Sequence, residues 1–344
     1  EDQLESKSCP DCDGELTDVR LFNLMFETNM GPIKDEDSSV YLRPETAQGI
    51  FVNFENVMKS MRLKLPFGIA QLGKAFRNEI TTGNFIFRTR EFEMMEIEYF
   101  VNPGDDEQTH LKWIDDFKNW YSDLGINSDN LRIREHEKSE LAHYAKATSD
   151  IEYKFPWGWG EIQGIANRTD YDLQAHSKQT GQKLSYFDEK SSKHVVPYVI
   201  EPSAGVDRTF MAVLLDSYHE EEVLTADGKS DKRVVLKLSP ELAPIKVAVL
   251  PLSRKDVLSN LSNQIHQDIK SSGVTTGIVE YDDSQSIGKR YRRQDEIGTP
   301  ICVTIDFDSI EDKCVTLRFR DTMEQIRIPM SNLTEQIRLN LKNV

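Results

Sequence analysis

The pattern of apolar and polar positions divides the chain into two parts. In the first part, stretches in which apolar and polar residues alternate are mixed with segments of helical spacing. A period of two is typical of strands with one buried face, and a period near 3.6 is typical of amphipathic helices. We predict strands at residues 68–76, 90–100, 161–165 and 196–201, and helices at residues 45–59, 108–124 and 205–218. Neighbouring strands joined by a short loop favour an α+β domain with an antiparallel sheet.

The second part reads as a smaller α/β domain with a largely parallel sheet. Strand, helix, strand, helix and strand follow one another, and they precede a hairpin and a final helix. The clearest segments are residues 246–250, 256–271, 273–281, 300–305, 315–320 and 325–328, with the last helix starting at Asn332. Residues 218–237 are charged, which predicts a loop or linker. We therefore predict two domains, residues 1–239 and residues 240–344.

Charge is distributed unevenly between the two parts. The chain has 344 residues and a formal net charge of -16, from 42 Lys+Arg and 58 Asp+Glu. Residues 244–344 hold 14 of each sign, so the whole acidic excess lies before Pro244. This balance argues against a broad nucleic-acid coating and places any RNA surface more easily on the second part. Four cysteines and the lack of a long apolar run favour an intracellular, cytoplasmic protein without a membrane span.

Two arginines and an aromatic residue lie on a predicted hairpin. One strand carries Arg77 and Glu79, and the returning strand carries Arg88 and Phe92. Guanidinium groups bind phosphate oxygens bidentately, and an aromatic ring can stack on a base. The hairpin therefore predicts a nucleotide site that does not depend on a glycine-rich loop.

Arg208 lies in the first turn of the helix predicted at residues 205–218. The N-terminus of a helix disfavours a cation, so an arginine there indicates either an anion-binding site or a solvated side chain. The residues from Glu201 to Arg208 do not separate these two interpretations when they are taken alone.

Several acidic residues also have two interpretations. Glu45 follows a proline at a helix start, where a carboxylate is favoured by the helix dipole. Glu96 and Glu98 share one face of a strand, which is either solvated or directed at a buried cation. Arg168 lies near Asp172, which is typical of a structural ion-pair network.

Cys9 and Cys12 form half of a possible zinc site. A structural zinc site needs four ligands, and the other two cysteines lie in the second part of the chain. We do not expect zinc at Cys9 and Cys12.

A basic cluster with one aromatic residue occurs near the end of the chain. Arg290, Arg292 and Arg293 surround Tyr291, which suits contact with an RNA backbone and stacking on a base. The acidic residues that follow favour a solvated loop instead.

These segments, in this order, resemble a class II aminoacyl-tRNA synthetase, and within that class the homodimeric type of glycyl-tRNA synthetase. The resemblance runs from about Cys9 to the C-terminus. Residues 77–79 with Arg88 and Phe92 resemble the second class-defining motif, and residues 205–208 resemble the third. The chain resembles the glycine-specific members of the class at residues 41–49, 65–71, 166–173 and 201–203. It resembles the anticodon-binding domain of these enzymes at residues 290–300.

The resemblance implies a site for ATP. Arg77 would hold the α-phosphate, and Arg88 and Arg208 would hold the outer phosphates. Phe92 would stack on adenine, and Glu79 would contact the adenine edge. Arg90 is a further candidate on the same hairpin.

The resemblance also implies sites for magnesium, glycine and tRNA. Glu201 would help to hold Mg²⁺ near the phosphates. Glu45, Glu96 and Ser203 would receive the glycine ammonium group, and Arg168 would shape the pocket. The basic cluster at residues 290–293 would contact tRNA(Gly).

The implied reaction explains why no Ser/His/Asp or Cys/His set is visible. Glycine's carboxylate attacks the α-phosphorus of ATP, pyrophosphate leaves, and the glycyl group then passes to the terminal ribose of tRNA. Phosphoryl transfer needs positioning and charge neutralisation more than a protein nucleophile. Because glycine offers no side chain to bind, we expect a small, acidic pocket whose tight walls exclude alanine.

The first class-defining motif of this family is not in the chain. That motif normally lies upstream and forms much of the dimer interface, and Glu1 falls within the family's insertion between the first and second motifs. We expect the full-length protein to be a homodimer.

Three other interpretations remain open. The chain could be a non-catalytic synthetase paralogue or accessory subunit, but such a protein would be expected to lose Arg77, Arg88 and Arg208. It could be an RNA-binding module in which only the second domain matters, against which Glu45 and Glu96 argue. The nearest enzymatic rivals are the prolyl, threonyl and histidyl synthetases.

Overall fold

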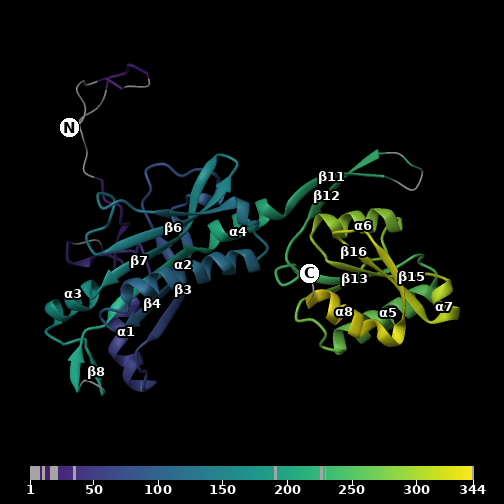
Figure 1. The fold of residues 1–344 in the computed structure, drawn as a ribbon. Coiled ribbons are helices and arrows are strands. Elements are labelled where there is room, and N and C mark those ends of the chain that lie inside the picture. The colour runs from purple at the N-terminus through teal and green to yellow at the C-terminus, as the bar shows by residue number, and fades with distance from the viewer. Residues whose placement is uncertain are drawn as a thin grey trace.

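The structure is a computed structural model that describes residues 8–9, 12–15, 22–33, 36–189, 192–224, 228 and 230–342. Figure 1 shows two lobes, each built around one main sheet and joined through strands β11 and β12. The helices are α1 (Ala47–Ser60), α2 (Asp106–Asp123), α3 (Tyr171–Thr180), α4 (Val206–Ser217), α5 (Asp256–Ser271), α6 (Ile287–Glu296), α7 (Asp308–Asp312) and α8 (Leu333–Lys342). The strands are β1 (Glu27–Asn29), β2 (Ser39–Tyr41), β3 (Phe67–Phe76), β4 (Glu91–Val101), β5 (Leu131–Glu135), β6 (Ala147–Phe155), β7 (Gly158–Thr169), β8 (Tyr186–Asp188), β9 (Lys193–Val195), β10 (Tyr198–Gly205), β11 (Tyr218–Leu224), β12 (Ser230–Leu236), β13 (Ile245–Pro251), β14 (Ile278–Tyr281), β15 (Ile301–Ile305), β16 (Cys314–Phe319) and β17 (Gln325–Pro329).

The first lobe contains a six-stranded sheet in the order β3-β4-β10-β7-β6-β5. Every neighbouring pair in this sheet is antiparallel, which confirms the predicted α+β class. The structure also contains β5, β6 and α3, which we did not predict. Their signal was present in part, because Ile151, Tyr153 and Phe155 are apolar at alternate positions of β6 and are buried.

The two faces of this sheet have different surroundings. On β4, the even-numbered residues Met94, Glu96 and Glu98 are buried on one face, and Tyr99 points to the other. Helix α2 covers that other face, where the ring of Trp113 lies 5.2 Å from the ring of Tyr99. The face that carries the two glutamates is therefore left to line the cavities described below.

The segment predicted as a loop or linker, residues 218–237, is a β-hairpin. Strands β11 and β12 pair antiparallel along their whole length, and β12 packs against α6 of the second lobe. The prediction was wrong because the charged residues are not all solvated: Arg233 is buried against Asp295 of α6. Residues 225–227 and 229 of this segment lie outside the described residues.

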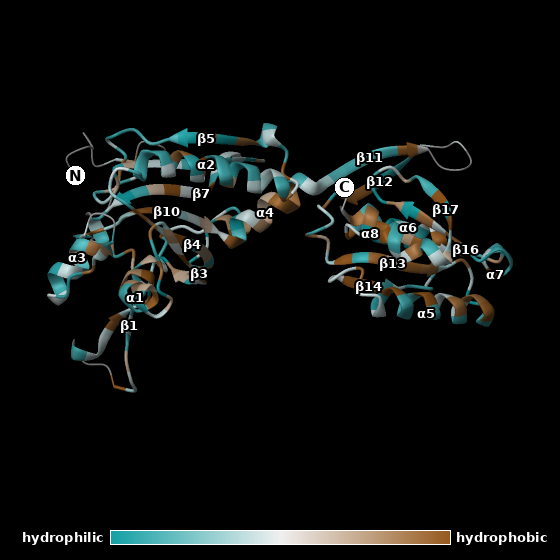
Figure 2. Ribbon diagram, turned by 60° about the horizontal axis from the view of Figure 1, so that its bottom comes forward, coloured by the Kyte–Doolittle hydropathy of each residue, from teal (hydrophilic) through white to brown (hydrophobic). Residues whose placement is uncertain are grey.

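The second lobe contains a five-stranded sheet in the order β14-β13-β15-β16-β17. Strands β13, β14 and β15 are parallel, as predicted, and β16 and β17 form the predicted hairpin, which runs antiparallel. Side chains of β13 alternate between two cores: Val247 and Val249 pack in a core that includes residues of α5 and α8, and Ala248 and Leu250 pack with residues of α6. Figure 2 shows this apolar strand between α5 and α6.

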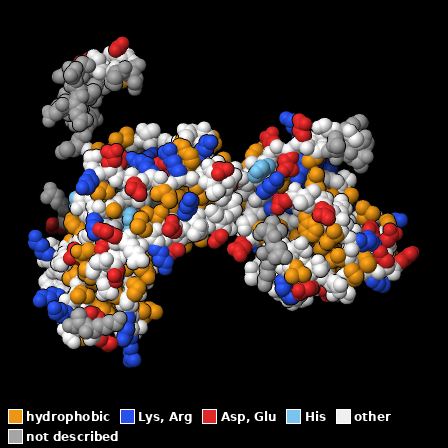
Figure 3. All heavy atoms as spheres, viewed as in Figure 1, with side chains coloured by type: hydrophobic (Ala, Val, Ile, Leu, Met, Phe, Trp, Pro, Cys, Tyr) orange, Lys and Arg blue, Asp and Glu red, His pale blue; other side chains and the backbone are white. Residues whose placement is uncertain are grey.

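The surface carries charges of both signs. On the face shown in Figure 3, Lys and Arg side chains are interspersed with Asp and Glu side chains over both lobes. Among the described helices, none has the length and apolar character needed to cross a membrane.

Candidate active site

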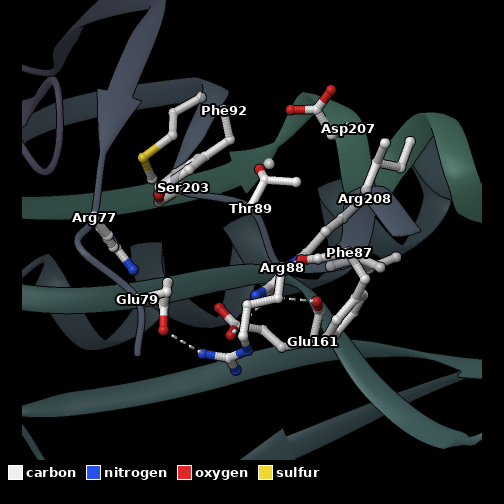
Figure 4. Close-up of a pocket in the computed structure, with 14 residues that line it drawn as sticks. Arg77, Glu79, Phe87, Arg88, Thr89, Phe92, Glu161, Ser203, Asp207 and Arg208 are labelled. Atoms are coloured by element: carbon white, nitrogen blue, oxygen red, sulfur yellow. Dashed lines mark hydrogen bonds and ion pairs between the residues drawn. The ribbon is translucent and has the colours of Figure 1, made fainter. Parts of the chain in front are cut away.

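Three arginines that are far apart in the sequence line one pocket of the first lobe. Arg77 follows β3, Arg88 lies in the loop between β3 and β4, and Arg208 lies in the first turn of α4. The pocket that they share has a volume of about 130 Å³. Figure 4 shows their side chains around this pocket, as the sequence led us to expect.

Contacts with the protein hold each guanidinium group in place. Arg208 donates from Nε to the carbonyl of Phe87 at 3.0 Å and from Nη1 to Glu161 Oε2 at 3.2 Å, and its guanidinium carbon lies 4.2 Å from the centre of the Phe87 ring. Arg88 donates to Oε2 of Glu79 at 3.2 Å. Arg77 donates from Nε to the carbonyl of Pro44 at 3.2 Å.

The pocket is suited to a polyanion. Burial lowers the pKa of the Arg208 guanidinium; Glu161 opposes this effect, and the positive charges of Arg88 and Arg77 add to it. The N-terminus of α4 adds a further partial positive charge at Arg208. An anion with several oxygens would relieve the repulsion among these groups and would accept hydrogen bonds from all three arginines.

Three other predicted residues, Phe92, Glu79 and Ser203, also line this pocket. Phe92 lies 5.5 Å from the guanidinium carbon of Arg77. Arg90 has a different place: it donates to the backbone carbonyls of Glu79 and Ile80 and is not among the residues that line the pocket. It stabilises the loop that carries Arg88.

Eight lining residues were not among the predicted site residues, and four of them are Phe87, Thr89, Glu161 and Asp207. Glu161 was read only as part of a strand, because an acid on an alternating strand is usually solvated. Phe87 could have been suspected from its position next to Arg88, but its stacking on Arg208 joins residues 121 positions apart.

A second pocket adjoins the first and is acidic. It has a volume of about 230 Å³, and Glu45, Glu96, Glu201 and Ser203 are among its lining residues. Arg77, Met94, Glu161 and Ser203 line both pockets, so the two spaces meet at these residues. The acidic lining agrees with the prediction, but the volume is larger than one glycine needs, so the expected tight walls are not evident.

The register of the sheet brings the second pocket's residues together. Ser203 of β10 lies opposite Glu96 of β4 on one side and opposite Gly164 of β7 on the other. Ser203 donates from Oγ to Oε1 of Glu96 at 3.2 Å. Thr46, just before α1, donates to Oε2 of Glu96 from its backbone nitrogen at 2.5 Å and also from its hydroxyl. Glu96 is therefore an oriented acceptor.

Arg168 is buried behind this pocket and holds two carboxylates. It donates from Nη1 to both oxygens of Glu201, at 3.0 and 2.9 Å, and from Nε and Nη2 to Asp172, at 2.7 and 2.9 Å. Its guanidinium carbon lies 3.9 Å from the centre of the Tyr144 ring. Arg168 thus shapes the wall of the pocket by fixing Glu201.

Glu201, which was expected to hold Mg²⁺ near the phosphates, lies apart from the pocket of the three arginines. Both oxygens of Glu201 accept from Arg168, and Glu201 lines only the second of the two pockets. Glu161 fits an ion better, because its half-exposed carboxylate lies in the pocket of the three arginines. One or two carboxylates together with substrate phosphates are the usual ligands of Mg²⁺. Among the described residues, no three metal-binding side chains form a cluster.

The basic cluster of the second lobe is helical rather than a solvated loop. Arg290 is buried in α6, and its Nη1 donates to the carbonyls of Pro251 and Asp282 at 2.6 and 3.0 Å. Contact between tRNA and Arg290 was therefore wrongly expected. Arg292 and Arg293 are partly exposed and paired with Asp231 and Asp282.

Cys9 and Cys12 lie at a tight turn. The backbone nitrogen of Cys9 donates to the carbonyl of Gly14 at 2.8 Å, and the nitrogen of Asp13 donates to the carbonyl of Cys9 at 2.9 Å. Residues 10 and 11 between the two cysteines lie outside the described part of the chain.

Comparison with known proteins agrees with this geometry. Residues 26–218 match the tRNA synthetase class II core domain (G, H, P, S and T), and residues 246–340 match the anticodon binding domain. The chain is 56% identical to the glycine–tRNA ligase of Thermobifida fusca over 97% of this chain and 72% of that protein. It is 58% identical to the glycine–tRNA ligase of Corynebacterium efficiens, over 93% of this chain and 69% of that protein, and 51% identical to that of Treponema denticola, over 99% and 75%. Two pockets that meet on an antiparallel sheet, and relatives of one name over most of the chain, lead to one conclusion: the protein belongs to the glycine–tRNA ligase family of class II aminoacyl-tRNA synthetases.

Proposed function

We propose that the protein activates glycine with ATP and transfers the glycyl group to tRNA(Gly). The observation that supports this most directly is the junction of the two pockets. Arg77 and Ser203 line both the basic pocket and the acidic pocket. A triphosphate in the first pocket and an amino acid in the second would meet at Arg77, where the carboxylate of glycine and the α-phosphate of ATP must react.

In the first step, an oxygen of the glycine carboxylate attacks the α-phosphorus, and the bond to the pyrophosphate oxygen breaks. Arg77 would bind the α-phosphate, and Arg88 and Arg208 would bind the outer phosphates. Phe92 would stack on adenine and Glu79 would contact its edge. Charge neutralisation by preorganised guanidinium groups is the main contribution that such a transfer needs.

Magnesium would be held at the phosphates with the help of Glu161 rather than Glu201. When bound, the ion supplies positive charge to the leaving pyrophosphate. Arg208, which bonds to Glu161 at 3.2 Å, would keep that carboxylate turned toward the phosphates.

The acidic pocket would bind the ammonium group of glycine. Glu96 is fixed by Thr46 and Ser203, and Glu201 is fixed by Arg168. Glu45 completes the acidic lining. Because these carboxylates are held in place before glycine arrives, little freedom is lost on binding.

In the second step, a terminal ribose hydroxyl of the tRNA attacks the glycyl carbonyl, and AMP leaves. We propose that residues 1–239 perform both steps and that residues 240–344 bind the anticodon stem, with Arg292 and Arg293 as candidates for contacts with tRNA. The homodimer and the cytoplasmic location expected from the family belong to this proposal.

Pyrophosphate exchange tests the proposal. We expect glycine to support exchange of labelled pyrophosphate into ATP, and Arg77→Ala to abolish it. If serine, proline or threonine supports exchange better than glycine, the substrate is wrong. If no amino acid supports exchange although ATP binds, the non-catalytic alternative is favoured.

A further inference from the structure

Glu98 is a buried acid that the proposed mechanism does not use. It lies on β4, two residues after Glu96 and on the same face of the strand. Its side chain has no exposed surface, and neither of its carboxyl oxygens has a hydrogen-bond partner among the described residues. An ionised carboxylate in such a place is costly, because nothing replaces the water that it has lost.

The other acids around Glu98 all have donors. Glu96 accepts from Thr46, and Glu201 and Asp172 each accept two hydrogen bonds from Arg168. Glu98 is the member of this group without a donor. Burial also raises the pKa of Glu201, to about 7, but Arg168 donates to both of its oxygens, so the hydrogen bonds assign the proton to Glu98.

The charges in this region do not balance. Four carboxyls are at least nine-tenths buried, those of Glu96, Glu98, Asp172 and Glu201, and they face one buried cation, Arg168. The lining of the pocket adds Glu45 ahead of α1, the cation Arg77, and Asp150, which pairs with His136, while Tyr144 stacks on Arg168. Helix α1 itself faces Arg168 with the ring of Phe51, 5.7 Å from the guanidinium carbon. The empty pocket thus has more acids than cations to neutralise them.

We propose that Glu98 carries a proton while the pocket is empty, and that this proton passes to solvent when the ammonium group of glycine enters among the carboxylates. The inference rests on the proposed function, since it requires that glycine binds here. The neutral carboxyl of Glu98 becomes a carboxylate, the ammonium group keeps its own three protons, and one proton leaves through the cavity lined by Glu96 and Glu201. The added cation replaces the proton in the local charge balance.

Electrostatics supports this exchange. Burial raises the pKa of Glu98 well above its ordinary value, Glu201 raises it further, and Arg168 opposes both effects. A bound ammonium group would act in the same direction as Arg168 and lower that pKa. Affinity should then rise with pH, by about tenfold per pH unit when one proton is released, because binding and proton loss are linked.

Titration calorimetry in two buffers of different ionisation enthalpy counts the released protons. We expect about one proton to leave for each glycine bound near pH 7. Binding without proton release would overturn the inference and leave the proposed function intact. Absence of glycine binding would instead contradict the proposed function, so the two failures are distinguishable.

The variant Glu98→Gln tests whether Glu98 is the group that releases the proton. Glutamine keeps the size of the side chain and is permanently neutral, so proton release should fall by about one per glycine and the pH dependence of the glycine Kd should flatten. Glu93→Gln, an exposed position of the same strand, should behave as wild type. Unchanged proton release in Glu98→Gln would refute the assignment to Glu98. The number of protons that the wild-type protein releases tests whether glycine binding is coupled to proton release, even if Glu98→Gln does not fold.

Discussion

Arg168 places one nitrogen, Nη1, between the two carboxylate oxygens of Glu201, at 3.0 and 2.9 Å. The remaining nitrogens of the guanidinium bind Asp172 of α3. One buried cation therefore fixes a pocket carboxylate on β10 and the start of a helix at the same time. This double role explains how Glu201 is held in the wall of the second pocket.

Replacing Arg168 by methionine should leave the carboxylates of Glu201 and Asp172 without their cation. Breaking a buried ion pair by removing one partner costs about 3–5 kcal/mol, because it leaves the other charge uncompensated. We expect a loss of that size in the free energy of urea unfolding, together with a rise in the glycine KM. Lys64→Met is the control, since its pair with Glu189 is exposed. A loss below about 1 kcal/mol would show that the carboxylates do not depend on Arg168.

Arg208→Ala should reduce kcat/KM for ATP in pyrophosphate exchange by about 100-fold, in the range found when one preorganised donor to a developing charge is removed. Arg90→Ala is the matched control, because Arg90 comes from the same hairpin as Arg88 but bonds only to loop carbonyls. We expect a loss of less than about tenfold for that variant. Equal losses of kcat/KM in the two variants would mean that Arg208 acts only by holding the loop that carries Arg88.

Gly160→Ala should disturb the pocket of the three arginines without changing a charge. A Cβ at this position would lie 2.9 Å from the ring of Phe87, which stacks on Arg208. We expect a higher ATP KM and a stability loss of about 1–3 kcal/mol from overpacking. Gly83→Ala in the same region meets open space and should change neither. An unchanged ATP KM in Gly160→Ala would show that the position of Phe87 is not critical.

Asp295→Asn should weaken the junction between the two lobes. Asp295 of α6 accepts from Arg233 of the β11–β12 hairpin at 2.9 Å and from Arg318 of β16 at 2.8 and 2.9 Å, and the Arg233 and Asp295 side chains are fully buried. We expect a loss of about 3–5 kcal/mol in unfolding free energy. Charging of tRNA should fall more than pyrophosphate exchange, because exchange needs only the first lobe.

The control for Asp295 is Asp283→Asn. Asp283 pairs with Arg254 at 3.5 Å, and both side chains are exposed. Exposed pairs of this kind contribute about 0–1 kcal/mol. If exchange and tRNA charging fall in parallel in Asp295→Asn, the junction does not serve to position the second lobe.

The stability of the empty protein should depend on Glu98 in a pH-dependent way. A carboxyl whose pKa is raised by folding keeps its proton in the native state above the pKa of the unfolded state, so stability falls as pH rises past about 4.5. Glu98→Gln lacks this loss. Its unfolding free energy relative to wild type should therefore increase as the pH rises from about 5 to about 8. A constant difference across that range would show that Glu98 does not titrate differently on folding.

Local patterns predicted much of the fold. The helix expected at residues 256–271 has those bounds in the structure, and the strand expected at residues 90–100 is observed at Glu91–Val101. In both segments, the periodicity of apolar residues matches the face that is buried. The hairpin at residues 218–236 was missed because its burial depends on Asp295, more than 60 residues from Arg233.

The arginines of the site were predicted from two short segments that are far apart in the sequence, the hairpin with Arg77 and Arg88 and the helix start with Arg208. Arg77, Arg88 and Arg208 line one pocket, although their roles stay predictions. The surroundings of Glu201 were not predicted, because its partner, Arg168, lies 33 residues away in the sequence and bonds to both of its oxygens. Arg290 was misread because a basic cluster does not show which of its members faces the protein interior; here Arg290 is buried and donates to backbone carbonyls. Pairings of this kind depend on tertiary structure and leave no local signal.

A crystal structure with a non-hydrolysable analogue of glycyl-adenylate tests the convergence of the two pockets most directly. We predict adenine against Phe92, the phosphate group bound by Arg77, and the ammonium group within about 2.7–3.2 Å of carboxylate oxygens of Glu96 or Glu201. An analogue bound outside these pockets would contradict the proposed reaction. The proposed reaction would also be contradicted if the ammonium group of the analogue lay away from the carboxylates and Arg77 bonded to the carbonyl of Pro44 but not to the analogue.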